Sequence, residues 1–428
     1  MIKSISSSYS HKSVKKLPLQ TNLETIMRLH RNLVFTVIDS LNEVFNEQEY
    51  ADKVIQKALK RDARWGARDR KFVAETFYEI VRWKRLYNEI AGTKDHYSRE
   101  NLWKIFAVWA VLRGIELPDW KYFENTPVRR IKGKFADLQE HRAIAQSIPD
   151  WMDELGSKEL GEKKWTKELI AQNIPASAIL RVNTLRGSLK QLKDLLAKDD
   201  IQTKLISGYP YALELIERKN VFKTTAFKSG LFEMQDASSQ LVATFLDVKP
   251  GMRVVDTCAG AGGKTLHIAA LMENKGSIIA TDIYGGILTE LKKRAKRAGA
   301  FNITTKKIES SKTIKKLYNS ADRVLIDAPC SGLGVLKRNP DSKWKLQPEF
   351  INDIKDTQKD ILSRYSKIVK VGGKIVYATC SILPSENQEQ VARFLGLNPD
   401  YKLIKDKKIL SSESGYDGFY MALIERIK

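Results

Sequence analysis

The sequence predicts an α/β domain with a mostly parallel sheet and helices on both faces, preceded by an all-α bundle and a small α+β segment. Three patterns support this: strand–turn–helix alternation in the C-terminal part, apolar residues at helical spacing in the N-terminal part, and short mixed pieces between them. The 428 residues suffice for two or three domains. We expect these parts in order: a basic flexible tail (1–22), a helical domain (23–146), an α+β segment (147–230) and the α/β domain (231–428).

The helical domain is predicted by apolar side chains that recur every three or four residues. Such stripes run along residues 23–45 and 69–91, whereas residues 102–112 are apolar nearly all round and are expected to be buried. Short polar or Pro/Gly breaks separate these segments, as in a compact bundle. The domain has no cluster of catalytic residue types, so we expect it to bind or to pack.

Beyond residue 147 the pattern changes to strands alternating with helices. In the α+β segment, helices are predicted at 164–172 and 189–198, with a strand at 178–185 between them. In the α/β domain, turns and long helical patterns separate four predicted strands: 253–256, 277–282, 323–327 and 374–379. Ligands of such sheets bind at the carboxyl ends of the strands. A glycine-rich turn and all three cysteines of the chain follow these ends.

The composition indicates which kind of partner the protein binds and in which cellular compartment it works. Lys and Arg number 73 against 51 Asp and Glu, a net charge of +22 that favours nucleic acid, with simple solubility as the alternative. Three cysteines are too few for a disulfide framework and fit a reducing cytoplasm. No apolar run reaches the ~18 residues of a membrane span, and the N-terminus lacks the apolar core of a signal peptide.

The turn DTCAGAGGKT (256–265) follows the first predicted strand of the α/β domain. Glycines let backbone N–H groups approach a ligand closely. A dinucleotide fingerprint would need a third glycine where Thr265 stands, and a Walker loop would need a glycine where Cys258 stands. A third interpretation is an S-adenosyl-L-methionine site, in which the turn wraps the methionine part and Asp282, ending the next strand, holds the ribose hydroxyls.

Cys330 and Cys380 follow strand ends in VLIDAPCSG and IVYATCS. A single cysteine is often a small buried hydrophobe, but all three cysteines of this chain lie at one predicted sheet edge. A thiolate that adds to carbon 6 of a pyrimidine makes carbon 5 nucleophilic enough to accept a methyl group, provided that nearby positive charge lowers the pKa of the thiol. An acid must also bind the ring's N3 and amino edge, and Asp327 is placed for that role.

The motifs DAPCSGLG (327–334) and ATCS (378–381) resemble those of the Sun/Fmu-type RNA cytosine-5 methyltransferases. More closely, the chain resembles the bacterial ribosomal RNA enzymes of that family, which carry an N-terminal NusB-like helical domain. In the helical domain the resemblance rests on the helical pattern and on RDRKFVAETFYEIVRWK (68–84). Further matching motifs extend over most of residues 175–428: RVNTLR (181–186), FEMQDASSQL (232–241), DTCAGAGGKT, RNPDSKW (338–344), PSENQEQV (384–391) and DGFYMALIER (417–426).

The resemblance implies a Rossmann-like class I methyltransferase domain and assigns roles to individual residues. Cys380 is the expected nucleophile, Cys330 is expected to assist product release, and Asp327 completes the catalytic set. Where the family reads C-A-A-P-G-G-K, this chain has Gly260-Ala261 in the middle of the loop, and the family's third-motif acid has its nearest match in Glu309. The expected cofactor contacts are Cys258, Ala259, Gly260, Ala261, Gly262, Gly263, Lys264, Asp282, Glu309 and Asp327.

The resemblance implies S-adenosyl-L-methionine as the cofactor and ribosomal RNA, of the small subunit (16S), as the substrate, with the target base extruded or single-stranded. We expect no metal, no membrane and a monomeric, cytoplasmic protein. Two alternatives stay open: a transfer-RNA methylase with the same chemistry, and a non-catalytic RNA-binding ribosome assembly factor. Lys337, Arg338 and Lys343 are candidates for phosphate contact, with solvated surface charge as the alternative.

Overall fold

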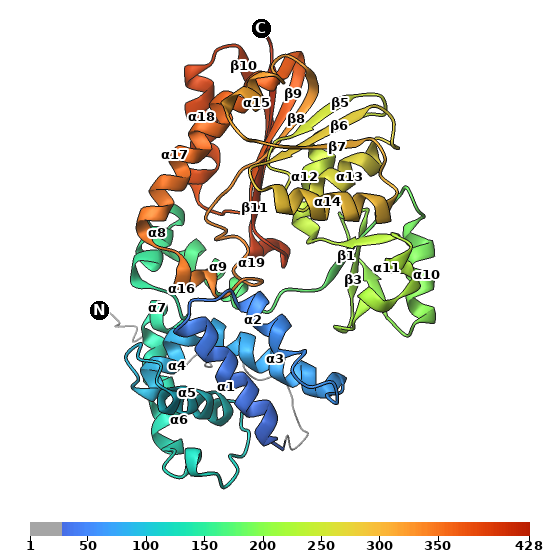
Figure 1. The fold of residues 1–428 in the computed structure, drawn as a ribbon. Helices are drawn as coiled ribbons and strands as arrows, with labels where there is room; N and C mark the ends of the chain where they lie inside the picture. Colours follow the sequence, from blue (N-terminus) through green and yellow to red (C-terminus); the bar gives the residue numbers. More distant parts are fainter. Residues whose placement is uncertain (1–27) are drawn as a thin grey trace, which may run out of the picture. The chain divides into compact units, whose positions relative to one another are not determined.

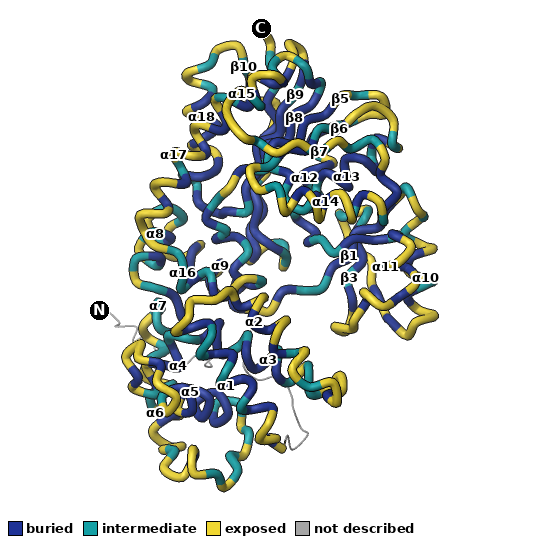
Figure 2. The backbone as a smooth tube through the Cα atoms, in the orientation of Figure 1, coloured by how far each residue is buried: buried dark blue, intermediate teal, exposed yellow. Residues whose placement is uncertain are grey.

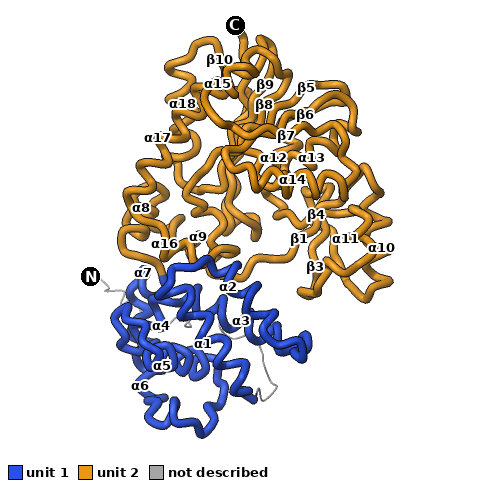
Figure 3. The backbone as a smooth tube through the Cα atoms, in the orientation of Figure 1, with its two compact units in different colours: residues 1–147 blue, residues 148–428 orange. Residues whose placement is uncertain are grey.

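The computed structural model describes residues 28–428 and divides the chain into two compact units, Met1–Ser147 and Ile148–Lys428 (Figure 3). The predicted basic tail, 1–22, and the beginning of the first predicted helix lie outside the described residues. Within residues 28–428, no helix is both long enough and apolar enough to cross a membrane.

Unit 1 is helical, and its most buried helix is α5 (Arg99–Leu112). The helix begins where the Ser98 hydroxyl accepts a hydrogen bond from the Asn101 backbone N–H at 3.3 Å. Its apolar surface is buried nearly all round, as predicted, and Trp103 stacks on Tyr122 with ring centroids 4.1 Å apart. The other helices of unit 1 are α1 (Arg31–Phe45), α2 (Ala51–Ala58), α3 (Ala67–Arg82), α4 (Lys84–Ala91), η1 (Lys121–Phe123), α6 (Val128–Asp137), η2 (Leu138–Glu140) and α7 (Arg142–Ala145).

The structure differs from the prediction at residues 69–91, where one helix was expected. Two helices, α3 and α4, meet at Trp83, whose backbone leaves the helical region at φ −101° and ψ 23°. The Tyr87 N–H still donates to the Trp83 carbonyl at 2.9 Å, whereas the Arg85 N–H donates to the Ser147 hydroxyl at 3.0 Å. Because neither proline nor glycine marks this position and Ser147, which bonds the start of α4, is distant in sequence, the periodicity alone could not reveal the bend.

Unit 2 begins with α8 (Asp150–Leu160) and α9 (Glu162–Gln172), followed by a four-stranded antiparallel sheet in the order β2-β3-β1-β4. Strand β4 pairs with β1, with Phe232 opposite Val182, so this sheet extends past residue 230, where the sequence pattern changes. The elements of this part are β1 (Ile179–Val182), α10 (Leu189–Lys198), β2 (Thr203–Leu205), β3 (Ala212–Leu215), η3 (Val221–Lys223), α11 (Thr225–Lys228) and β4 (Phe232–Met234).

The larger sheet of unit 2 has seven strands in the order β10-β11-β9-β8-β5-β6-β7 (Figure 1). The neighbouring pairs from β9 to β7 are parallel, whereas β11 runs antiparallel to β9 and to β10. The strands are β5 (Arg253–Asp256), β6 (Ser277–Asp282), β7 (Ile303–Lys307), β8 (Ala321–Asp327), β9 (Val369–Thr379), β10 (Tyr401–Ile409) and β11 (Phe419–Arg426). The helices are α12 (Ala237–Phe245), α13 (Gly263–Leu271), α14 (Gly285–Ala298), α15 (Ser311–Lys315), α16 (Ser342–Lys345), α17 (Pro348–Tyr365), η4 (Ser366–Ile368), η5 (Pro384–Glu386), α18 (Gln388–Leu397) and α19 (Ser411–Ser414).

This strand order creates a topological switch point beside β5. From β5 the chain continues to β6 and β7 on one side, and then returns to β8 and β9 on the other side. Loops from the carboxyl ends of β5 and β8 therefore separate and leave a ligand crevice. The predicted parallel sheet with flanking helices is confirmed.

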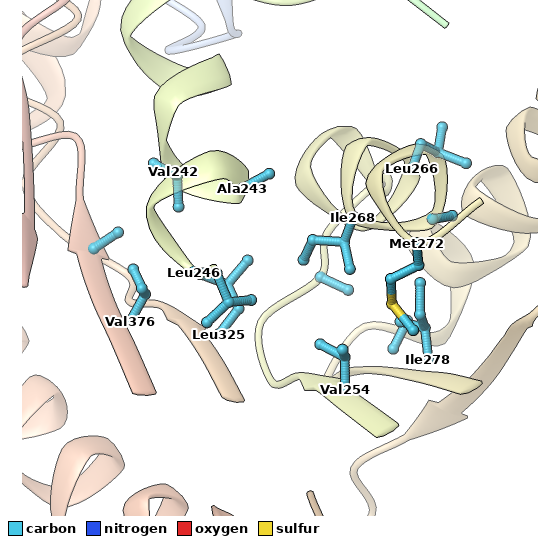
Figure 4. Close-up of a cluster of buried hydrophobic side chains, with 14 of the residues drawn as sticks. Val242, Ala243, Leu246, Val254, Leu266, Ile268, Met272, Ile278, Leu325 and Val376 are labelled. Carbon is cyan, nitrogen blue, oxygen red and sulfur yellow. The ribbon is translucent and has the colours of Figure 1, made fainter. Parts of the chain in front are cut away.

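Both faces of the larger sheet are covered by apolar packing. Because successive side chains of a strand point to opposite faces, Leu325 packs with α12 and α13 (Figure 4), whereas Val324 and Ile326 pack with α17 and α18. The central strands are accordingly buried along most of their length (Figure 2). Burial on both faces leaves the strand ends as the accessible edge of the sheet.

A buried carboxylate joins the small sheet to α14 of the larger domain. Glu233 on β4 has a side chain only 4% exposed and accepts hydrogen bonds from Arg294 at 2.9 Å and from Arg297. The Arg294 guanidinium also donates to the Ala261 carbonyl of the glycine turn at 2.8 Å. The small sheet therefore helps to hold the turn in place.

We expect Glu233→Gln to lower the free energy of unfolding by about 2 kcal/mol, because it leaves two arginines without their carboxylate in a largely buried site. Urea unfolding followed by circular dichroism measures the change. Glu290→Gln is the control, because its exposed pair with Lys293 at 3.8 Å contributes less than about 0.5 kcal/mol. Equal losses in the two variants would contradict a structural role for the Glu233 cluster.

Candidate active site

The three cysteines follow three adjacent strands of the larger sheet. Cys258 lies two residues beyond β5, Cys330 three residues beyond β8, and Cys380 directly beyond β9. Because β8 is the neighbour of both β5 and β9 and all three are parallel, the three loops emerge at one edge of the sheet. The structure thus brings the cysteines to the predicted edge.

The sulfurs of Cys330 and Cys380 lie 3.3 Å apart, as free thiols within hydrogen-bond distance. The interaction with Cys380, burial and the Glu386 carboxylate together raise the pKa of the Cys330 thiol well above its ordinary value. Two thiolates at this distance would repel each other, so at most one sulfur of the pair carries charge. The environment of Cys330 makes it the protonated partner.

Lys264 and Asp327 form an ion pair beside the two cysteines. The Lys264 ammonium on α13 lies 2.6 Å from the Asp327 carboxylate at the end of β8, and the lysine side chain is only 13% exposed. Burial alone would lower the pKa of this ammonium, but Asp327 and, more weakly, Cys380 outweigh burial and raise it. Lys264 therefore stays charged and places positive charge within electrostatic range of the Cys380 sulfur.

The glycine turn has backbone angles that favour glycine and one face that other atoms leave open. Gly260 and Gly262 have φ of +52° and +85°, a region that L residues rarely adopt. A Cβ on Gly260 would meet only Ile287 Cδ1, at 4.0 Å, so this side of the turn is open. The buried Arg181 donates to the Gly263 carbonyl, which fixes the start of α13.

Asp282 ends β6 and closes the turn on its other side. Its carboxylate accepts hydrogen bonds from the Gly260 N–H at 2.9 Å and from the Tyr284 N–H at 2.9 Å. Each carboxylate oxygen keeps acceptor capacity for a hydroxyl group. Glu309 lies two residues beyond β7 at the same edge of the sheet, and its side chain is exposed.

The Cys258 thiol and the Asp256 carboxyl group also belong to the turn and have raised pKa values. The Cys258 thiol is half-buried, and burial raises its pKa, so this sulfur is a poor nucleophile. Asp256 is buried at the end of β5 and accepts a hydrogen bond from the Thr265 hydroxyl at 2.7 Å, and burial raises its pKa to about 7. Asp256 fixes the end of the turn through the hydrogen bond from Thr265.

The expected phosphate contacts at Lys337 and Lys343 are wrong. The Lys337 ammonium donates to the Gly415 carbonyl at 2.6 Å and that of Lys343 donates to Asn173 at 2.7 Å, and both lysines are buried. Arg338 is held by two carboxylates, those of Asp236 and Asp417, each at 2.6 Å. The charge pattern was visible in the sequence, but the buried partners that bind these cations were not.

Two residues of this region had no role assigned from the sequence. Arg181 and Glu386 belong to the RVNTLR and PSENQEQV motifs, but no local spacing indicates what they contact. Both are buried and bind backbone or hydroxyl groups of the loops that carry the expected site residues. The only signal in the sequence for these two residues is that each is a charged residue inside a motif that matches the family.

The described residues contain no group of three or more His, Cys, Asp or Glu side chains arranged to hold a metal ion. The turn offers an open backbone face at Gly260 and a carboxylate at Asp282, which could hold an organic cofactor. These are the groups that would bind the methionine part and the ribose of S-adenosyl-L-methionine.

Comparison with known proteins decides the family. The family model described as 16S rRNA methyltransferase RsmB/F matches residues 243–424, and the RsmF/B-like ferredoxin-like domain matches residues 148–222. The chain is 31% identical to the probable ribosomal RNA small subunit methyltransferase B of Synechocystis sp., over 87% of this chain and 90% of that protein. The chain belongs to the RsmB/F family of 16S rRNA methyltransferases. The resemblance inferred from the cysteine motifs is confirmed.

Other relatives agree with this family assignment. The probable ribosomal RNA small subunit methyltransferase B of Bacillus subtilis is 31% identical, over 79% of this chain and 76% of that protein. The crystal structure of a methyltransferase homolog protein from Pyrococcus horikoshii superimposes with a TM-score of 0.60 at 27% identity, covering 67% of this chain and 97% of that one. The Rossmann-like class I methyltransferase fold expected for this RsmB/F member is confirmed.

We expect Gly262→Ala to weaken binding of S-adenosylhomocysteine by at least about tenfold and to lower stability, because the new Cβ would lie 2.5 Å from Leu291 Cγ at a φ of +85°. Isothermal titration calorimetry measures the binding. Gly286→Ala is the control, because its Cβ would meet no atom within 4 Å. Unchanged binding by Gly262→Ala would contradict the placement of the donor at this turn.

Proposed function

We propose that this RsmB/F-family enzyme methylates carbon 5 of a cytosine in 16S ribosomal RNA. S-adenosyl-L-methionine is the donor, and Cys380 is the nucleophile that forms a covalent adduct with carbon 6. The observation that carries the proposal is the Cys330–Cys380 sulfur pair, 3.3 Å apart, beside the Lys264–Asp327 ion pair. Methyl transfer to an oxygen or to an exocyclic nitrogen would not need a thiol pair.

The glycine turn supports the choice of donor. The backbone of 258–264 would hold the methionine part, Asp282 the ribose, and the region of Glu309 the adenine. The bound donor supplies an electrophilic methyl group on a sulfonium sulfur. Arg181 and Arg294 keep the turn in shape through the Gly263 and Ala261 carbonyls.

The side chains of the site divide the reaction between them. The Cys380 thiolate adds to carbon 6 of the ring, so that an S–C bond forms and electron density moves to carbon 5. The Asp327 carboxylate accepts a hydrogen bond from the amino group of the cytosine edge, and the Lys264 ammonium next to it lies within electrostatic range of the attacking sulfur. After carbon 5 has received the methyl group, a base takes the proton from carbon 5, the electrons of that C–H bond restore the C5–C6 double bond, the S–C6 bond breaks, and Cys380 leaves as a thiolate. Cys330 assists this elimination.

The helical unit is proposed to be a NusB-like domain that contributes RNA contacts. Arg129, Arg130 and Lys132 on α6 are exposed, and within residues 28–428 no acidic side chain pairs with them. Such unpaired cations on one helix can neutralise phosphates and release counterions. A ribosomal RNA substrate is also consistent with the cytoplasmic location and the net charge of +22 expected from the sequence.

The first test is methyl transfer from radiolabelled S-adenosylmethionine to RNA from cells that lack this protein. We expect label in 16S ribosomal RNA as 5-methylcytosine, and bisulfite mapping identifies the position. Label confined to transfer RNA would replace the proposed substrate. Donor binding without transfer to any RNA would instead favour the non-catalytic assembly factor.

The second test separates the two cysteines. We expect Cys380→Ala to abolish turnover and adduct formation because the attacking sulfur is lost. Cys330→Ala is expected to accumulate a protein–RNA adduct because elimination is blocked. Denaturing gel electrophoresis with labelled RNA measures the adduct, and the wild type, which retains both sulfurs, is the control. Identical behaviour of the two variants, or exchanged behaviour, would overturn the assignment of the nucleophile.

A further inference from the structure

Glu386 lies behind the sulfur pair, six residues after Cys380 along the chain. Its side chain is fully buried in the short helix η5, and both of its carboxylate oxygens are occupied. Oε1 accepts from the hydroxyls of Ser331 at 2.5 Å and Ser381 at 2.6 Å. Oε2 accepts from the Ser331 N–H at 2.8 Å and from the Gln358 amide at 2.9 Å.

These partners come from three separate elements, which gives the carboxylate an unusual position. Ser331 follows Cys330 in the loop after β8, Ser381 follows Cys380 in the loop after β9, and Gln358 lies on α17. The Gln358 amide also donates to the Pro329 carbonyl at 2.9 Å, directly before Cys330. One side chain therefore binds the residue after each cysteine, and through Gln358 it also supports the residue before one of them.

The four groups around this buried carboxylate all donate to it, and a neutral amide in its place would leave some of these donors without an acceptor. The hydrogen bonds therefore require the loops after β8 and β9 to keep one relative position. A shift of the loops by about 1 Å would break these bonds and move the two sulfurs apart, which is enough to cost about 100-fold in rate.

The charge of Glu386 also acts on one sulfur more than on the other. The groups that face Cys330 are Cys380 and Tyr377 on and after β9, and Glu386 on η5. The anion adds to the interaction with Cys380 and to burial in raising the pKa of the Cys330 thiol. The nearby cation, Lys264, interacts instead with Cys380.

We propose that Glu386 is a positioning residue that holds the Cys330 and Cys380 loops together and places its carboxylate beside Cys330, so that Cys380 alone provides the attacking sulfur. This inference rests on the proposed cysteine chemistry and adds to it the group that makes the two sulfurs unequal. Glu386 touches neither the RNA base nor the donor in this arrangement.

The experiment compares Glu386→Gln with Glu389→Gln, an exposed glutamate three residues further along the chain. We expect Glu386→Gln to lower kcat for methyl transfer about 100-fold, with KM for S-adenosylmethionine changed less than about twofold, because the donor turn is untouched. Glu389→Gln is expected to match the wild type. Wild-type kcat in Glu386→Gln would overturn the proposal.

A second readout distinguishes positioning of charge from a general loss of structure. In a Cys380→Ser background, the pH dependence of iodoacetamide alkylation at Cys330 is followed by peptide mass spectrometry. We expect Glu386→Gln to move the Cys330 profile to lower pH by about one unit, because a like charge has been removed. An unmoved profile would overturn the electrostatic part of the proposal. This readout needs no RNA, so it decides the role of Glu386 even if wild-type protein fails to methylate ribosomal RNA, a result that would refute only the proposed function.

Ser381→Ala keeps the proposal testable if Glu386→Gln does not fold. This variant removes one hydrogen bond between Glu386 and the Cys380 loop but keeps the buried charge. We expect kcat to fall about tenfold while the Cys330 alkylation profile stays at its wild-type position. Wild-type kcat in Ser381→Ala would contradict the coupling of the two loops.

Discussion

Two sulfur atoms 3.3 Å apart cannot both be negatively charged, and this constraint organises the candidate active site. The surroundings decide which sulfur carries the charge. Glu386 faces the Cys330 loop with a buried anion, whereas Lys264 brings a buried cation within range of Cys380. The interaction with Cys380 and burial raise the pKa of the Cys330 thiol, and the Glu386 anion adds to both. The two chemically identical side chains therefore lie in different electrostatic surroundings, as the proposed division into a nucleophile and a protonated partner requires.

The order of the strands places the two cysteines and the charged residues around them. Parallel pairing of β8 with β9 puts Asp327 opposite Ala378, so the loops that carry Cys330 and Cys380 begin at the same level of the sheet. Parallel pairing of β8 with β5 brings the glycine turn and Lys264 to the other side of Asp327. Both loops end in buried contacts rather than in solvent, because α17 covers this face and supplies Gln358. The chemistry is thus placed by backbone register and fixed by a few buried polar side chains.

The sequence was sufficient for the parts of this arrangement that depend on local pattern. Strands β5 and β6, the glycine turn and the motifs around Cys330 and Cys380 could be predicted, because alternation, turn residues and motif spacing are local signals. Partners distant in sequence could not be predicted. Lys343 looked like a surface cation because its partner, Asn173, is 170 residues away, and the same reason hid the contact between Arg181 and Gly263. The bend at Trp83 was missed because no proline or glycine marks it, and Ser147, whose hydroxyl binds the start of α4, is 62 residues away from Arg85.

The departure of the glycine turn from the family pattern can be understood in the same terms. Gly260 stands where the family has alanine, and its φ of +52° is one that glycine adopts without strain. Glycine also makes the unfolded loop more flexible, so ordering it costs more conformational entropy. Two hydrogen bonds oppose that cost: the Gly260 N–H is bound by Asp282 and the Ala261 carbonyl by Arg294. Arg294 is itself held by Glu233 of the small sheet. The four-stranded sheet therefore stabilises a loop that its own sequence leaves flexible, which explains why the donor turn depends on a part of the chain that carries none of the reacting groups.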